Sequence, residues 1–263
     1  MSRGIAAYAA LERHLASKDG SGLVRERYPA ASGDNAYSYE WPYAQVHIAA
    51  LDLAAVDARY AAEVAERAKA REHYWNAGGG ATELPGYDSY PRVPYGSGGD
   101  MFYDENEWVG LAKVQLHLQT GNSATLARAE GIFDLVSSGW DTDSTHAAPG
   151  GVFWTQANWS QDRNTVSNMP GAQLALRLLQ ITGEDCYPHW ARRLCYWTDT
   201  YPTTGKDKGS RTVQHVWINH LAGVSHADAR SGCQVRQRAG PGRRLGAKAV
   251  SAPSTTGLTP APR

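Results

Sequence analysis

The stretch Leu118-Gln119-Thr120-Gly121-Asn122 is followed, 62 positions later, by the related stretch Gln180-Ile181-Thr182-Gly183-Glu184. In both, a Thr-Gly pair ends an apolar helical pattern, and glycine is the residue that most easily adopts the left-handed conformation at a helix C-terminus. The same offset pairs Ile132 with Leu194 in the helix that follows. Each unit is therefore predicted to be a helix, a Thr-Gly stop, a second helix and a long return loop. Stacked hairpins of this kind indicate an all-α fold of the α/α toroid type.

Hydrophobic periodicity predicts helices elsewhere in the chain as well. The segments expected to be helical are 3–17, 41–74, 105–120, 123–138, 168–182 and 187–200. A loop rich in Gly, Pro and Tyr is expected over 77–100, and only Gly151-Val152-Phe153-Trp154 has the character of a strand. The chain is therefore predicted to form six or seven helices.

The composition of the chain changes near residue 203. Residues 1–228 contain all 26 acidic residues but only nineteen of the 26 basic ones, a net charge of −7, whereas the last 35 residues carry +7. No aromatic residue follows Trp217. We therefore predict a globular domain over 1–202 and a largely disordered basic tail over 203–263, because the tail has too little apolar surface to offset its ordering entropy. A truncation or a change of reading frame near residue 203 would produce such a tail.

Composition also restricts the possible partners. An acidic body argues against nucleic acid and against anionic membrane surfaces, and the sequence contains no apolar run long enough to span a bilayer. The N-terminus lacks the apolar core of a secretory signal, so the chain as written is expected to be cytoplasmic, or secreted if a signal has been lost. The chain contains fourteen Tyr and nine Trp but only three Phe. This bias fits a carbohydrate-binding surface and, equally, a large helical core whose aromatic rings are partly exposed to solvent.

Two adjacent carboxyl groups, Asp104 and Glu105, lie between aromatic residues just before an apolar helical pattern. Glycosidic bond cleavage typically requires two carboxyl groups beside the scissile bond, one to donate a proton and one to attack or to activate water. The alternative is structural, because Asp104 through Glu107 also fits an acidic cap at the start of a helix. No histidine or cysteine spacing predicts a metal site.

Several motifs in a fixed order surround this carboxyl pair. They are Tyr39–Gln45, Gly86–Tyr90, Tyr103–Trp108, Gly150–Trp154, Asn164–Asn168 and Leu174–Leu178. In this order they resemble glycoside hydrolase family 76, the endo-α-1,6-mannanases, over roughly residues 5–201. The resemblance implies an (α/α)6 barrel of twelve helices, of which this chain would form only part.

The resemblance also implies a retaining cleavage of α-1,6-mannosidic linkages in α-mannan or manno-oligosaccharides, by a monomer that requires no cofactor. Asp104 would be the nucleophile and Glu105 the general acid/base. The chain departs from the family pattern at Glu105, where the family has a second aspartate. A catalytically silent sugar-binding protein and another sugar enzyme on a helical toroid, such as an epimerase, a lyase or a different glycosidase, are the alternatives.

Five further residues are expected to bind the sugar. They are Tyr103, Asn106, Trp108, Trp154 and Asn168. For Trp108 and Trp154 a place in the core is the alternative, and for Asn168 the alternative is a cap on the helix that follows Ser167.

Overall fold

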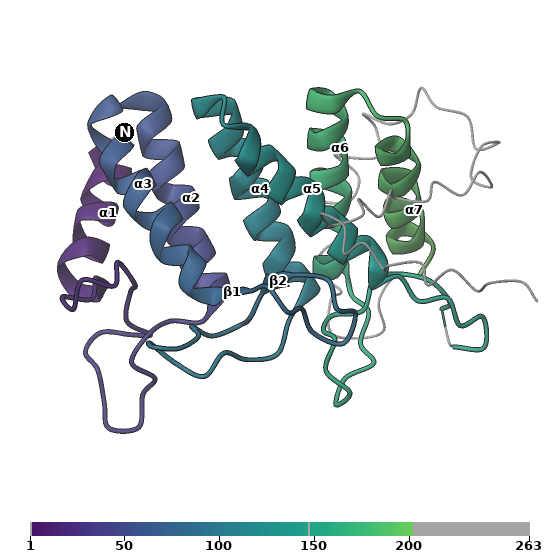
Figure 1. The fold of residues 1–263 in the computed structure, drawn as a ribbon, viewed down its shortest axis with the longest axis horizontal. Helices are drawn as coiled ribbons and strands as arrows, with labels where there is room; N and C mark the ends of the chain where they lie inside the picture. Colours follow the sequence, from purple (N-terminus) through teal and green to yellow (C-terminus); the bar gives the residue numbers. More distant parts are fainter. Residues whose placement is uncertain (1, 147, 202–263) are drawn as a thin grey trace, which may run out of the picture.

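The computed structural model describes residues 2–146 and 148–201, and within them the chain is almost entirely helical (Figure 1). Its α-helices are α1 (Ser2–Leu15), α2 (Glu40–Val56), α3 (Ala61–Arg71), α4 (Tyr103–Thr120), α5 (Ser123–Ser138), α6 (Met169–Thr182) and α7 (Cys186–Thr200). Its short elements are the 3-10 helices η1 (Ala58–Tyr60), η2 (Glu72–Tyr74) and η3 (Thr165–Ser167) and the antiparallel strands β1 (Trp75–Asn76) and β2 (Gly86–Tyr87). The predicted all-α class is confirmed. The predicted tail, 203–263, lies outside the described residues.

The two Thr-Gly stops end helices as the repeat predicts. Gly121 follows α4 with φ 68°, and Gly183 follows α6 with φ 70°. The backbone N–H of each glycine donates to the carbonyl four residues earlier, His117 or Leu179, which satisfies a carbonyl at the helix end. Because this turn is so short, α5 folds back on α4 and α7 on α6 as two equivalent hairpins.

The segment 41–74 differs from the prediction of one long helical segment. Asp57 leaves the helical conformation with φ −150° and ψ 104°, and its carboxylate accepts a hydrogen bond from the Arg59 backbone N–H. An aspartate that binds the backbone two residues ahead competes with helix continuation. The segment is therefore a third hairpin, α2 and α3, joined through η1.

The hairpins stand side by side, and α2, α4 and α6 form a contiguous layer in which α4 packs against both of the others. The long connections 16–39, 72–102 and 139–168 all lie at one end of the helices, where α2, α4 and α6 begin (Figure 1). The layer is closely packed at Gly110, where an added Cβ would lie 2.6 Å from a methyl carbon of Leu174. This arrangement brings the N-termini of the three helices to a common face, called the loop face below.

The segment expected to be a strand, Gly151–Trp154, forms only isolated bridges, from Val152 to Trp140 and from Phe153 to Arg163. The predicted strand is therefore not formed as a ladder, and it follows two glycine positions in the left-handed region, Gly150 with φ 94° and Gly151 with φ 78°. Among the described helices, none combines the length and the apolar character that crossing a membrane would require.

Candidate active site

The start of α4 is held by the extended segment that precedes η3. The Tyr103 backbone N–H donates to the Trp154 carbonyl at 2.9 Å, and the Gln156 N–H donates to the Met101 carbonyl at 3.0 Å. The Thr155 hydroxyl donates to the same Met101 carbonyl at 3.0 Å. Two segments about fifty residues apart in sequence are thereby fixed to each other, and the first turn of α4 has a defined position on the loop face.

Asp104 is the second residue of α4, and both of its carboxylate oxygens accept hydrogen bonds. Oδ1 accepts from the Glu105 backbone N–H at 2.9 Å, and Oδ2 accepts from the Trp154 indole at 3.1 Å. The N-cap residue is Phe102, which makes no side-chain cap, so Asp104 does not cap the helix as the alternative interpretation required. Asp104 and Glu105 nevertheless lie in the first turn of α4, where negative charge is favoured by the helix dipole. Burial raises the pKa of Asp104 to about 6, and these two hydrogen bonds oppose the rise.

Glu105 follows in the same first turn, where the helix directs successive side chains about 100° apart around its axis. Its Oε2 atom is enclosed and accepts no hydrogen bond from any residue that the structure describes. Burial, together with the charges of Glu40 and Asp104, raises its pKa to about 9. Between about pH 6 and pH 9, Asp104 is therefore ionised while Glu105 keeps its proton, which is the division of roles that a nucleophile and a general acid require.

Two fully buried carboxyl groups lie close to this pair. Glu40 is the first residue of α2, and Glu107 lies one turn after Asp104 on α4. Glu107 faces the start of α6, where an added Cβ on Gly171 would lie 2.6 Å from Glu107 Oε1. Burial and the charge of Asp104 raise the pKa of Glu107 well above its usual range. Neither carboxyl was among the predicted site residues, although Glu40 is the one acid in the aromatic motif Tyr39–Gln45.

An aromatic wall borders Asp104. The Phe102 and Trp154 rings lie 4.9 Å apart, and Trp159 lies 5.7 Å from Trp154. The Trp159 indole donates to Asp100 at 2.7 Å, and the residue is 61% exposed. Trp108 is half-buried, one turn after Asp104. Trp154 therefore lies beside Asp104, and its role in sugar binding stays a prediction. Trp159 was not predicted; an isolated tryptophan in a polar loop is the sequence signal that could have identified it.

Tyr103, Asn106 and Asn168 occupy scaffold positions in this structure. Tyr103 is buried, and its ring lies against Gly139 so closely that an added Cβ there would be 2.5 Å away. The Asn106 amide accepts from the Tyr87 N–H at 2.8 Å and donates to the Tyr87 carbonyl at 2.9 Å. Asn106 and Asn168 are 0% exposed and Tyr103 is 4% exposed, so all three side chains face the protein interior in this structure.

Asn168 repeats the contacts of Asn106 in the next hairpin. Its Oδ1 accepts from the Val152 N–H at 2.9 Å, and its Nδ2 donates to the Val152 carbonyl at 3.4 Å. Each asparagine also donates to the carbonyl four residues before it. The two asparagines are 62 positions apart, the offset of the Thr-Gly repeat. The repeat therefore includes a buried asparagine that binds the long loop before α4 and, equivalently, the long loop before α6 to the start of the following helix. Asn168 occupies the N-cap position of α6 without a side-chain cap bond.

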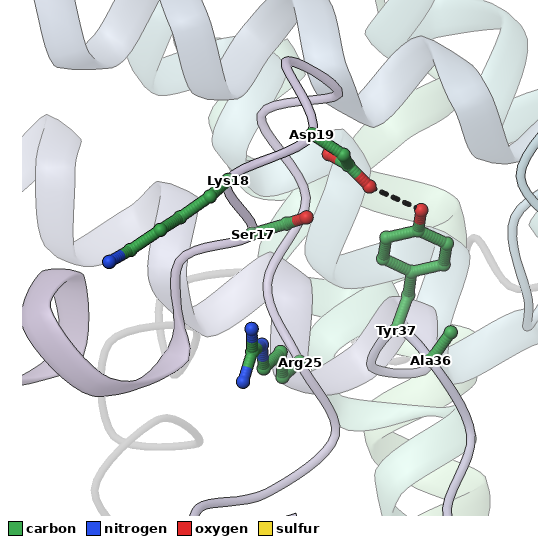
Figure 2. Close-up of a pocket in the computed structure, with 6 residues that line it drawn as sticks. All are labelled: Ser17, Lys18, Asp19, Arg25, Ala36 and Tyr37. Carbon is green, nitrogen blue, oxygen red and sulfur yellow. Dashed lines mark hydrogen bonds between the residues drawn. The ribbon is translucent and has the colours of Figure 1, made fainter.

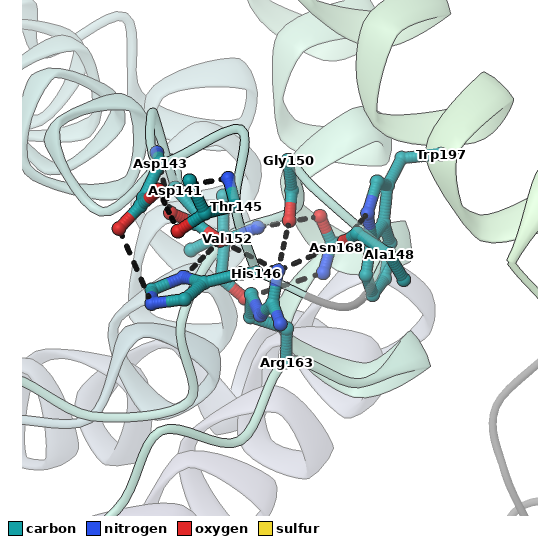
Figure 3. Close-up of polar contacts among 10 residues, drawn as sticks. All are labelled: Asp141, Asp143, Thr145, His146, Ala148, Gly150, Val152, Arg163, Asn168 and Trp197. Atoms are coloured by element: carbon teal, nitrogen blue, oxygen red, sulfur yellow. Dashed lines mark hydrogen bonds and ion pairs between the residues drawn. The ribbon is translucent and has the colours of Figure 1, made fainter.

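A network of charged side chains stabilises the loop that carries Trp154 (Figure 3). The Asp141 carboxylate accepts from Arg163 Nη1 at 2.6 Å and lies 2.9 Å from His146 Nδ1. Arg163 Nη1 also donates to the carbonyls of Ala148 and Gly150. The same loop is also bound by Asn168 at Val152, so the segment that leads to Trp154 has two separate sets of contacts.

A shallow hollow of about 380 Å³ lies elsewhere on the loop face, on the connection between α1 and α2 (Figure 2). It is lined by Ser17, Lys18, Asp19, Arg25, Ala36 and Tyr37. The Tyr37 hydroxyl donates to Asp19 at 2.5 Å. The hollow includes neither member of the carboxyl pair, so we do not assign the catalytic chemistry to it.

Comparison with known proteins identifies relatives of this arrangement. The family model described as glycosyl hydrolase family 76 matches residues 18–215. Mannan endo-1,6-alpha-mannosidase DCW1 of Candida albicans is 35% identical over 77 residues, which are 28% of this chain and 16% of that protein. A family 76 glycoside hydrolase from a bovine Bacteroides thetaiotaomicron strain aligns over 75% of this chain and 41% of its own, with a TM-score of 0.63 and 25% identity.

A further solved structure contains a sugar. It is an inactive variant of the α-1,6-mannanase GH76A of Salegentibacter sp. HEL1_6, with two consecutive aspartates replaced by asparagine, in complex with α-1,6-mannotriose. It aligns over 75% of this chain and 50% of its own, with a TM-score of 0.56 and 18% identity. The present chain thus spans half or less of each of these three relatives. The structural likeness establishes that its hairpins belong to an α/α toroid.

Proposed function

Because this chain belongs to glycosyl hydrolase family 76, we propose that it hydrolyses α-1,6-mannosidic linkages with retention of configuration. We assign the nucleophile to Asp104 and the general acid/base to Glu105, in a domain formed by residues 1–202. The observation that carries this assignment is the contrast between the two neighbours, since Asp104 is hydrogen-bonded as a carboxylate and Glu105 is enclosed as a neutral acid.

Retention of configuration requires a two-step displacement. In the first step, an Asp104 oxygen attacks the anomeric carbon while Glu105 transfers its proton to the departing glycosidic oxygen. In the second step, the Glu105 carboxylate takes a proton from water as the water attacks the anomeric carbon and releases Asp104. The Trp154 indole holds the Asp104 carboxylate in one orientation, and the wall of Phe102, Trp154 and Trp159 offers aromatic faces for sugar rings.

The choice of substrate rests on the relatives. The Candida albicans relative is named a mannan endo-1,6-alpha-mannosidase, and an inactive variant of the Salegentibacter α-1,6-mannanase is in complex with α-1,6-mannotriose. An α-1,6-linked mannan is therefore the substrate to test first. Incubation of the purified chain with this mannan should release new reducing ends, and Asp104→Asn should release none.

The two carboxyl roles can be separated with an α-1,6-manno-oligosaccharide that carries an aryl leaving group, because such a group departs without protonation. Glu105→Gln should then still release a burst of the phenol and stop at the covalent intermediate, whereas Asp104→Asn should release no phenol. A burst from Asp104→Asn would contradict the assignment.

The glutamate at position 105 gives one specific reason to consider sugar binding without turnover, since the resemblance predicts aspartate there. Calorimetry with α-1,6-mannotriose distinguishes this alternative. Binding by a wild-type chain that produces no reducing ends, with the same affinity after Asp104→Asn, would favour the silent binder over the hydrolase.

A further inference from the structure

Trp159 is an aromatic residue that is exposed to solvent and yet held in a defined orientation. It is 61% exposed. Its indole N–H, the only polar group of the side chain, donates to Asp100 Oδ2 at 2.7 Å. The ring packs edge-to-face on Trp154, with the two planes 87° apart, and lies 6.0 Å from the Phe102 ring. Because the polar edge of the indole is already bound, the surface that Trp159 presents to solvent is apolar and aromatic.

Asp100 also lines a small hollow on the loop face. The hollow has a volume of about 150 Å³, and its walls come from the connections 72–102 and 139–168. Other polar side chains in its lining are bound within the protein, since Asn76 donates to Asp88 at 2.9 Å and Gln156 donates to the Thr82 hydroxyl at 3.2 Å. Asp100 Oδ1, in contrast, accepts no hydrogen bond from a residue that the structure describes. One carboxyl group therefore orients the Trp159 ring with one oxygen and offers the other to a ligand.

This combination of groups fits one sugar unit. A pyranose ring has a face of C–H groups, which can lie on an aromatic face, and hydroxyl groups at its edge, which can donate to a carboxylate oxygen. Hydrogen bonds to a charged acceptor are also stronger than those between neutral groups. A site that encloses a drug-sized ligand typically has about 300–1,000 Å³. The smaller hollow beside Asp100 therefore suits a single unit of a longer chain.

We propose that Trp159, Asp100 and this hollow form a subsite that binds one mannosyl unit beyond the cleaved bond and so favours long α-1,6-mannan chains over short ones. The inference rests on the proposed function. Asp104 takes its side-chain hydrogen bonds from the Glu105 N–H and the Trp154 indole, and Trp159 lies one ring further along the aromatic wall. A sugar on Trp159 is therefore a neighbour of the two units that the cleaved bond joins.

The dependence of hydrolysis on chain length tests the subsite. The two substrates are α-1,6-mannobiose, which contains only the two units joined by the cleaved bond, and α-1,6-mannohexaose. In Trp159→Ala the ratio of kcat/KM for the hexaose to that for the biose should fall about tenfold, mainly through KM, because a large aromatic contact is lost. Trp159→Phe keeps a ring and should lower the ratio less.

Tyr196→Ala is the matched control for Trp159→Ala. Tyr196 is 63% exposed, but it lies on α7, outside the aromatic wall and the hollow. Its ratio of the two kcat/KM values should equal that of the wild type. A wild-type ratio in a Trp159→Ala protein that unfolds at the wild-type urea concentration would overturn the proposal.

Two further variants test the hollow separately from the ring. Asp100→Ala removes the free carboxylate oxygen and the acceptor of the Trp159 indole. Ala81→Leu adds carbon atoms at the rim of the hollow, on a different loop from Trp159. Both variants should lower the hexaose-to-biose ratio. A wild-type ratio in both would overturn the assignment of the hollow to this subsite.

Binding at Trp159 can be followed without turnover. In ¹⁵N NMR of the Asp104→Asn protein, the Trp159 indole N–H resonance is the one missing from Asp104→Asn/Trp159→Phe. It should shift when α-1,6-mannohexaose is added and stay in place with α-1,6-mannobiose. A shift with the hexaose in a chain whose wild type does not cleave mannan would support the subsite and contradict only the proposed function. An unshifted resonance would overturn the subsite, whether or not the wild type is active.

Discussion

Asp104 shows how one residue combines burial with specific hydrogen bonding. Burial alone would favour the neutral acid, but the Glu105 N–H and the Trp154 indole both donate to the ionised form. The balance leaves the pKa at about 6, so the carboxylate is available at neutral pH without being fully solvated. A desolvated carboxylate held by two donors is a stronger nucleophile than one surrounded by water.

The two carboxyl pKa values predict the pH dependence of the reaction. Activity requires Asp104 ionised and Glu105 protonated, so kcat/KM should rise as pH increases through about 6 and fall as it passes about 9. A profile of kcat/KM against pH on α-1,6-mannan checks this directly. An alkaline limb well below pH 7 would mean that Glu105 is not the acid or is not enclosed as the structure shows.

We expect Trp154→Phe to change only the acid limb of the kcat/KM profile against pH. The phenyl ring keeps the contact with Phe102 but cannot donate to Asp104, and a carboxylate that loses a donor gains a proton more readily. The acid limb should therefore move to higher pH, and kcat/KM at pH 6 should fall severalfold. Trp159→Phe is the matched control, because it removes an indole hydrogen bond to Asp100 instead. The same acid-limb shift in both variants would contradict the role of the indole.

At the scale of elements, the helices were predictable because their signals are local. The Thr-Gly stops and apolar periodicity placed α5 at 123–138 and the ends of α4 and α6, and the structure confirms them. The break at Asp57 was missed because its signal is a single aspartate in an alanine-rich segment. The carboxyl pair was identifiable from its position at the start of a helix and from the family resemblance. The burial of Glu40 at the start of α2 depends on tertiary packing, which no local pattern records.

The roles of Asn106 and Asn168 were missed for a related reason. Each binds a loop residue more than a dozen positions earlier, across a connection whose path the sequence does not specify. Their shared offset of 62 residues was available in the sequence, but a single matched asparagine is too weak a signal without the geometry. The two equivalent contacts make them a natural pair for mutation.

Asn168→Ala should destabilise the protein and weaken catalysis together. It leaves the Val152 N–H and carbonyl without their partner in a buried site, and each unsatisfied buried group costs about 1–3 kcal/mol. The free energy of unfolding, measured in urea, should fall by at least about 2 kcal/mol. Asn106→Ala should lower the free energy of unfolding by a similar amount. Because Val152 lies two residues before Trp154, kcat should decrease as well.

Asn122→Ala is the comparison for both asparagine variants. Asn122 caps α5 from an exposed position, with its Oδ1 accepting from the Ala124 N–H. Loss of such a cap typically costs about 1 kcal/mol, and it should leave kcat unchanged. If Asn168→Ala and Asn106→Ala cost no more than Asn122→Ala, the two buried asparagines do not fasten the loops as their contacts indicate.

At the scale of the whole molecule, the buried acids of the site make the folded protein less stable as pH rises. Glu40, Glu105 and Glu107 all have pKa values raised by burial. Such groups contribute stability that is complete below their unfolded pKa, near 4.5, and that is lost as pH rises through the folded value. The hairpins and the fastened loops supply the stability that keeps these acids enclosed on the loop face.

The contribution of Glu105 to this pH dependence of stability can be measured. From about pH 4.5 to about 9 the unfolded chain has lost the Glu105 proton and the folded protein still holds it, so this residue lowers the free energy of unfolding by roughly 1 kcal/mol for each pH unit. Between pH 7.5 and 8.5 the wild type should therefore lose stability faster than Glu105→Gln by about that slope. Urea denaturation of both proteins across this range gives the difference, and groups common to both cancel. Parallel slopes would show that Glu105 is ionised in the folded protein at neutral pH, and they would remove the basis for assigning it the role of general acid.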